Sequence, residues 1–202
     1  MGIDLGALLT PFFTVLGTIF VAELTDKDAL LLLTLATRIK PKIAFAAGAT
    51  AFTITTTIIV TLGYFLITVV PVFWIRLVGG FVMIGFAVWQ YLNTKEEESE
   101  EKKLLERTKR STALSIFLGA VSMLILLDLA GDATEVLTIV FVAHFSNVLL
   151  VFLGAVLALV AASAVETILG SRLKKYLSAS RLRLLSLLIF LVIGSYIIVT
   201  SL

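Results

Sequence analysis

The stretch FVAELTDKDALLLL, residues 20–33, places four ionisable side chains in the middle of an otherwise apolar run: Glu23, Asp26, Lys27 and Asp28. The meaning of these charges depends on whether the run lies in a membrane, and the composition answers that question. Of the 202 residues, 59% are hydrophobic and 15% are charged, with a mean hydropathy of +1.10. A soluble domain has about 45–50% apolar and about 25% charged residues. Too few polar residues remain to form the outer shell of a soluble domain, so the composition predicts an integral membrane protein.

Six apolar segments are long enough to cross a bilayer, because a transmembrane helix needs about 20 predominantly apolar residues. They are residues 6–38, 43–69, 72–92, 113–144, 147–169 and 184–202. The first and fourth exceed the length of one crossing, and each carries acidic residues near its middle. Each is either one tilted helix or two half-helices broken at the acidic residues, which is tolerated where irregular backbone is buried in protein. The expected fold is an all-α integral membrane protein with six transmembrane spans.

The distribution of basic residues predicts the orientation of these spans. With six crossings, the loops after the first, third and fifth spans lie on one side of the membrane, and they hold every Lys and Arg except Lys27 and Arg76. Short loops rich in Lys and Arg stay in the cytoplasm. We therefore expect both termini on the non-cytoplasmic side, and the charged segment 93–112 in the cytoplasm as a solvated connector.

The charged segment also divides the chain into two parts. It separates a first half, residues 1–92, from a second half, residues 113–202, and we expect three spans in each. Because three is an odd number, the second half must be inserted in the opposite orientation to the first. Inverted repeats of this kind build many secondary transporters, whose substrate site lies near the midplane where the halves meet.

The two halves carry matching landmarks at a nearly constant offset. ELTDKDALLLLTLATR, residues 23–38, aligns with LAGDATEVLTIVFVAH, residues 129–144, and this alignment pairs Asp26 with Asp132. The symmetry of an inverted repeat then predicts that the two acidic clusters face each other at the middle depth of the membrane.

The acidic residues of both halves are the candidate cation ligands. A charge at the bilayer centre costs about 2.5–3.5 kcal/mol, so these side chains must face the protein interior and be paired, protonated or bound to a cation. Residues three or four apart share one face of a helix, which lets each half present two carboxylates inward. The candidate cation-binding residues are Glu23, Asp26, Asp128, Asp132 and Glu135, and the expected metal ligands among them are Glu23, Asp26, Asp132 and Glu135. The residues expected to support them are Thr25, Lys27, Asp28, Gly131 and Thr134.

Converging carboxylates are suited to hard cations, since calcium, magnesium and manganese prefer oxygen ligands. The clusters contain neither Cys nor His, which argues against zinc or copper. Protons compete with a cation for crowded carboxylates, so cation binding expels protons and protonation releases the cation. We expect Lys27 to replace the cation in the empty site by pairing with Glu23 or Asp26.

Other polar residues have simpler interpretations. We expect the hydroxyls of the Thr-rich run TAFTITTTIIVT, residues 50–61, to bond mostly to their own helix. His144 is expected to be a polar residue at the outer end of a helix. Glu166 is expected to lie near the cytoplasmic end of its span and to pair with Arg172.

The acidic clusters resemble the signature of the calcium:cation antiporter-2 family, which includes the Golgi calcium/manganese transporter and bacterial manganese exporters. Members of this family carry Glu-x-Gly-Asp-(Lys/Arg)-(Thr/Ser) twice, once near the first span of each half. ELTDKD, residues 23–28, keeps the Glu, Asp and Lys but departs at Thr25 and Asp28. LAGDAT, residues 129–134, keeps the Gly, Asp and Thr but lacks the leading Glu and the basic residue. The resemblance implies a secondary transporter that exchanges calcium or manganese for protons, needs no cofactor and is not an enzyme.

Three other functions stay open from the sequence. An intramembrane aspartyl protease would need Tyr-Asp and Gly-x-Gly-Asp motifs, and both are missing around Asp26 and Asp132. In a non-transporting membrane subunit the acids would only hold helices together, but the clusters contain six acids and one basic residue, so pairing cannot neutralise them. The main alternative is an exporter of cadmium, sodium or an amino acid with a similar layout. The expected partners are a divalent cation, protons and the lipid bilayer, without nucleic acid, and a homo-oligomer stays open.

Overall fold

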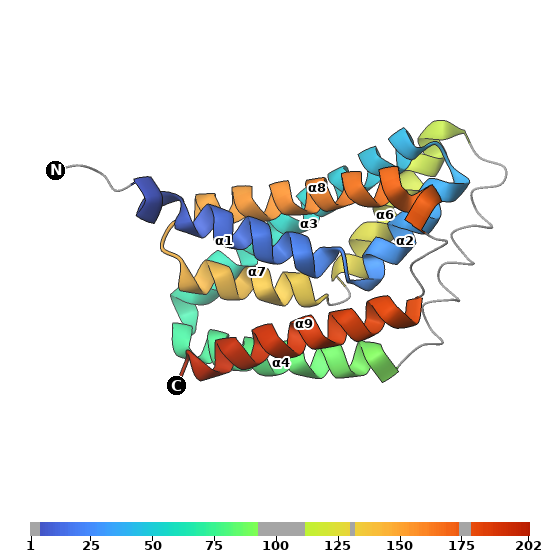
Figure 1. Cartoon of the computed structure of the whole chain (residues 1–202). Helices are drawn as coiled ribbons and strands as arrows, with labels where there is room; N and C mark the ends of the chain where they lie inside the picture. Colours follow the sequence, from blue (N-terminus) through green and yellow to red (C-terminus); the bar gives the residue numbers. More distant parts are fainter. Residues whose placement is uncertain (1–4, 93–111, 130–131, 174–178) are drawn as a thin grey trace.

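The computed structural model describes residues 5–92, 112–129, 132–173 and 179–202, and every regular element within these ranges is an α-helix (Figure 1). The helices are α1 (Leu5–Glu23), α2 (Lys27–Arg38), α3 (Pro41–Val69), α4 (Val72–Leu92), α6 (Ala113–Leu129), α7 (Ala133–His144), α8 (Val148–Leu173) and α9 (Ala179–Val199). The expected all-α architecture is confirmed for these ranges. Nearly all of the charged segment 93–112 lies outside the described residues.

Proline positions set two of the helix boundaries. Pro41 is the first residue of α3, and the preceding Lys40 has an extended backbone with φ −61° and ψ 126°. Pro71 directly precedes α4 and follows Val70, which is also extended. Proline fits these positions because it lacks the N–H that the first helical turn leaves unbonded, and because its ring disfavours a helical conformation of the preceding residue. Both boundaries agree with the junctions expected from the sequence.

The two longest apolar segments are each broken into two half-helices at their acidic residues. Residues 24–26 separate α1 from α2, and residues 130–132 separate α6 from α7. The end of α1 tightens, since the N–H groups of Thr25 and Asp26 bond to carbonyl oxygens only three residues back, at 3.1 and 2.9 Å. The axes of α6 and α7 differ by 63°. The structure therefore adopts the broken alternative in both halves.

The two halves run through the molecule in opposite directions (Figure 1). The chain follows α1 and α2 away from the end where α1 begins and α9 finishes, and it follows α6 and α7 back toward that end. The unbroken helices differ in direction in the same way, because α3 and α8 are antiparallel to each other, as are α4 and α9. The helix ends that flank the charged segment 93–112 lie at the far end of the molecule.

Each long unbroken helix packs along the broken helix of the other half. α3 contacts α6 and α7, α8 contacts α1 and α2, and α3 and α8 contact each other. α4 and α9 form a pair beside this group, and α4 also packs against α7. The broken helices touch as well, since α1 contacts α7 and α2 contacts α6. This antiparallel arrangement brings the end of α1 and the start of α7 to the same level of the molecule (Figure 1).

Glycines allow several of these helices to approach closely. A Cβ atom at Gly154 of α8 would lie 2.8 Å from the carbonyl oxygen of Phe12 in α1. Gly80 of α4 and Gly194 of α9 face each other, and a Cβ atom on either one would lie 2.9 Å from the other's carbonyl oxygen. Close contact through small residues is typical of membrane helices, because apolar lipid provides no hydrophobic drive for their association.

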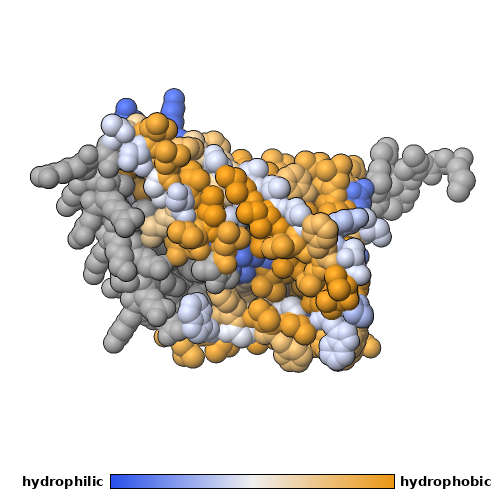
Figure 2. Space-filling model, turned by 180° about the vertical axis from the view of Figure 1, so that it is seen from behind, coloured by the Kyte–Doolittle hydropathy of each residue, from blue (hydrophilic) through white to orange (hydrophobic). Residues whose placement is uncertain are grey.

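The outer surface of the molecule is strongly apolar. Hydrophobic residues cover most of the described part of the face shown in Figure 2. Large side chains with more than half of their surface exposed include Phe65, Trp74, Phe81, Leu126 and Val192. An apolar surface of this extent suits contact with lipid rather than with water.

Several helices have the length and composition of membrane spans. Within the described residues, α3, α4 and α8 are each long and apolar enough to cross a membrane, and α6 together with α7 forms a fourth candidate that is bent at the break. The described apolar parts of α1 and α9, Leu9–Glu23 and Leu184–Val199, are shorter.

Candidate cation-binding site

Asp132 is fully buried and caps the first turn of α7. Its backbone is extended, with φ −119° and ψ 153°, and its Oδ1 accepts a hydrogen bond from the N–H of Ala133 at 2.7 Å. Its Oδ2 accepts a hydrogen bond from the hydroxyl of Thr134 at 2.9 Å. The N-terminus of a helix presents unbonded N–H groups and a partial positive charge, both of which stabilise a carboxylate. Both oxygens of this buried carboxyl group therefore have a hydrogen-bond donor from the first turn of α7.

Asp26 occupies the equivalent position in the first half. It directly precedes the first residue of α2, as Asp132 directly precedes that of α7, and 1% of its surface is exposed. The alignment of the two aspartates in the sequence is thus matched by their local structure. The neighbouring Thr25 is also buried, and its hydroxyl donates to the carbonyl oxygen of Ala22 at 2.8 Å. The same carbonyl oxygen also accepts the N–H of Thr25 at 3.1 Å, so both donors of Thr25 bond to Ala22 at the end of α1.

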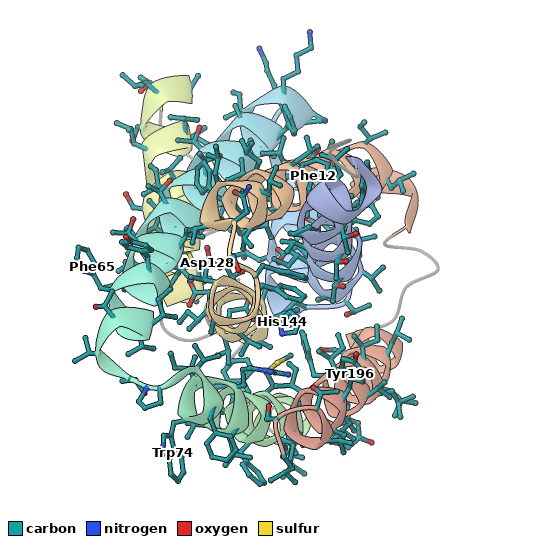
Figure 3. The ribbon with its side chains drawn as sticks, turned by 90° about the vertical axis from the view of Figure 1, so that its left-hand side faces the viewer. Phe12, Phe65, Trp74, Asp128, His144 and Tyr196 are labelled. Atoms are coloured by element: carbon teal, nitrogen blue, oxygen red, sulfur yellow. The ribbon has the colours of Figure 1, made fainter. Side chains whose placement is uncertain are left out.

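Each break also follows a carboxylate at the end of its first half-helix, but the two carboxylates lie at positions that differ by one residue in the alignment of the halves. Glu23 is the last residue of α1 and is fully buried. The aligned residue in the second half, Leu129, is 41% exposed, whereas Asp128 before it is 4% exposed. In Figure 3, Asp128 lies among the helices, while Phe65 and Trp74 lie at the periphery. The second half therefore places its inward carboxylate one residue earlier than the motif would suggest.

Asp128 is bonded across the boundary between the halves. Its Oδ2 accepts a hydrogen bond from the hydroxyl of Thr55, a buried residue of α3. Other hydroxyls of the Thr-rich run bond to carbonyl oxygens one turn back in α3, as predicted: Thr53, Thr56, Thr57 and Thr61. The bond of Thr55 was not predicted from the sequence, because no residue near Thr55 in the chain indicates that its partner comes from the other half.

The structure describes only some of the other residues that were predicted to form the site. Glu135 lies in the first turn of α7 and is partly buried. Gly131 and the side chains of Lys27 and Asp28 lie outside the described part of the chain, so the predicted pairing of Lys27 stays a prediction. Among the described residues, no three His, Asp or Glu side chains lie close enough together to hold a metal ion. The roles of the five candidate cation ligands therefore also stay predictions.

Glu166 lies in the last two turns of α8 and is buried. Its exposed fraction is 3%, and Ser163 and Thr167 on the same helix are buried as well. This part of α8 therefore packs against other helices, and the predicted pair with Arg172 stays a prediction. The side chain of Arg172, the predicted partner of Glu166, lies outside the described residues. His144 is exposed at the last position of α7, in agreement with the prediction.

Comparison with known families decides the class of protein. A family model described as divalent cation/proton antiporter GDT1 matches residues 11–98 and 112–202. The chain belongs to this family. GDT1 proteins are transmembrane antiporters and not enzymes, which confirms the expected class and excludes the protease alternative. Neither a curated protein nor a solved structure matches the chain.

The GDT1 match also agrees with the internal repeat. Its two segments correspond to the two halves recognised in the sequence, and each contains one helix break and one buried aspartate that precedes a half-helix. The family resemblance inferred from the two motifs is thereby confirmed, although the second motif keeps only part of the pattern.

Proposed function

We propose that this GDT1-family antiporter exchanges calcium or manganese for protons through a carboxylate site where its two halves meet. The observation that carries this proposal is the equivalent placement of Asp26 and Asp132. Each is buried, each directly precedes a half-helix, and each comes from a different matched segment. A hard divalent cation prefers carboxylate oxygens as ligands, and in the proposed site each helix break supplies them.

The proposed membrane topology has six spans, formed by α1–α2, α3, α4, α6–α7, α8 and α9. The halves 1–92 and 113–202 are inserted in opposite orientations around the connector 93–112. The opposite directions of the two halves in the structure support this arrangement (Figure 1). The basic residues cluster in the loops on the connector's side, which places that side in the cytoplasm and both termini outside.

The exchange follows from competition for the same oxygens. In the proposed site Asp26 and Asp132 bind the cation, Glu23 and Glu135 complete the ligand set, and Asp128 adds a further carboxylate. When the cation leaves, protons replace it, because several negative charges in a low-dielectric interior repel one another. Cation entry on one side of the membrane therefore releases protons, and protonation on the other side releases the cation.

Three neighbouring residues are proposed to support this cycle. Thr134 fixes the orientation of the Asp132 carboxylate through its observed hydrogen bond. Thr25 shapes the turn that ends α1 through its bond to the carbonyl of Ala22. Lys27, the first residue of α2, supplies a positive charge that pairs with a carboxylate when no cation is bound.

Exchange is tested with purified protein reconstituted into liposomes that contain a pH-sensitive dye. Calcium or manganese added outside should raise the luminal pH, because cation influx is coupled to proton efflux. Magnesium, sodium and cadmium, added in turn, test the alternative substrates. If no metal changes the luminal pH, the proposal is wrong. Glu97→Gln in the charged connector is the control for carboxylate substitutions, and it should exchange like the unaltered chain.

A further inference from the structure

Thr55 and Asp128 form a buried hydrogen bond between the two halves. Thr55 belongs to α3 and Asp128 to the last turn of α6, and their exposed fractions are 1% and 4%. The Thr55 hydroxyl donates to Oδ2 of Asp128. Because α3 packs along both α6 and α7, this bond lies beside the second helix break, about one helical turn before Asp132 in the chain.

The Thr55 hydroxyl has more than one acceptor within reach. Its Oγ1 lies 3.2 Å from each of the carbonyl oxygens of Ala51 and Phe52, one turn back in α3. A hydroxyl has one proton and two lone pairs, so it donates to one acceptor at a time. Of these acceptors, only Asp128 belongs to the other half, whereas the two carbonyl oxygens belong to the helix of Thr55 itself.

We propose that Thr55 is a positioning residue that holds Asp128 toward the cation site, so that Asp128 replaces the leading Glu missing from the second motif. This inference rests on the proposed function, in which Asp128 is one of the cation-binding residues. The side chain of Leu129, at the aligned motif position, contains no oxygen, and this residue is 41% exposed. Since Thr55 belongs to the first half, it connects the ligand set of the second half to a helix of the first.

The substitution Thr55→Val removes the hydroxyl and keeps the branched shape. In the liposome assay the apparent KM for the cation should rise about ten- to hundredfold, the range expected for losing a hydrogen bond to a charged group. The maximal rate should change much less, because the carboxylates remain in place. Thr55→Ser restores a hydroxyl and should return the KM close to its original value.

Thr56→Val is the matched control. Thr56 is the next residue of the same helix and is equally buried, but its hydroxyl bonds to the carbonyl oxygen of Phe52 at 2.6 Å. The Thr56→Val substitution should leave the apparent KM for the cation unchanged. Equal effects of Thr55→Val and Thr56→Val would overturn the inference, because both would then report only the loss of a buried hydroxyl.

A double substitution separates positioning from a general structural effect. In an Asp128→Ala background, Thr55→Val should raise the KM no further, whereas an additive effect would overturn the inference. Cation-dependent thermal stabilisation of the purified protein reports binding even where transport is too slow to measure. If the unaltered chain shows no exchange, the proposed function fails. Exchange by the unaltered chain with an unchanged KM in Thr55→Val contradicts the role of Thr55 alone.

Discussion

The two helix breaks have the position of one aspartate in common and differ in the hydrogen bonds of the neighbouring residues. In both, a buried aspartate directly precedes the second half-helix: Asp26 before α2 and Asp132 before α7. In the second break, Thr134 donates its hydroxyl to that aspartate. In the first break, Thr25 donates to the carbonyl of its own helix instead. The position of the aspartate is thus the feature that the two halves have in common, while its neighbours are bonded differently.

The carboxylate that precedes each break also differs in position and bonding between the halves. Glu23 is the last residue of α1, whereas Asp128 lies one residue before the end of α6 and is held by Thr55 of α3. A cation between two inverted halves needs enough oxygens from each side, and these oxygens need not come from aligned residues. The comparison teaches that, in the proposed site, symmetry between the halves applies to the helix breaks more strictly than to the individual carboxylates.

The strongest test of this comparison is to neutralise the shared aspartates one at a time. Asp26→Asn and Asp132→Asn should each reduce exchange by about a hundredfold or more, because each removes a charged ligand of the cation. Asparagine is as good a helix N-cap as aspartate, so the thermal stability of the cation-free protein should change little. Exchange in liposomes and thermal unfolding in detergent check both expectations. Normal exchange by either variant would show that the two breaks are not equivalent.

The next test asks which residue of the second half replaces the leading Glu of the motif. Asp128→Ala should raise the apparent KM about tenfold or more, through loss of one carboxylate. Adding Leu129→Glu to this variant restores the motif in the sequence, but the side chain at this position is 41% exposed. We therefore expect no recovery of the KM in the same liposome assay. Recovery would show that a carboxylate at position 129 also reaches the cation, which would contradict its outward placement as the reason why Asp128 replaces the motif Glu.

The smallest expected effects concern the two threonines. Thr134→Val should raise the KM severalfold, because Asp132 loses one hydrogen bond but keeps the one from the N–H of Ala133. Thr25→Val should leave the KM within about twofold, since its hydroxyl bonds to a backbone carbonyl. Parallel titrations of the cation measure both values. A larger effect of Thr25→Val than of Thr134→Val would reverse the contrast between the breaks.

Much of the fold could be predicted from local sequence. Composition indicated apolar helices, and the bounds of the apolar segments indicated two junctions, which lie at Pro41 and Pro71 because proline restricts its own backbone and that of its predecessor. The sequence left open whether the long segments were continuous or broken. The local bonding at Thr25, Asp26 and Asp132 shows how they break, through a tightened turn in one half and a capped helix in the other.

The candidate site was predictable where its chemistry is local and less so where it depends on packing. The spacing and alignment of the acids indicated Asp26 and Asp132 as a pair. The partner of Thr55 is set by the packing of α3 against α6, so no local pattern identifies it. The burial of Glu166 likewise depends on how α8 packs against its neighbouring helices, which no local pattern specifies.

A shared cation between Asp26 and Asp132 is the central claim, and the absence of cysteine from the chain makes a direct test possible. The double variant Asp26→Cys, Asp132→Cys replaces two hard oxygen ligands by thiolates, which favour a soft metal such as cadmium. We predict that purified double variant binds cadmium at least about tenfold more tightly than either single variant, measured by protection of the thiols from alkylation, because two thiolates then hold one ion. Equal cadmium affinity in the double variant and the single variants would show that the two positions do not share an ion, and would contradict the account.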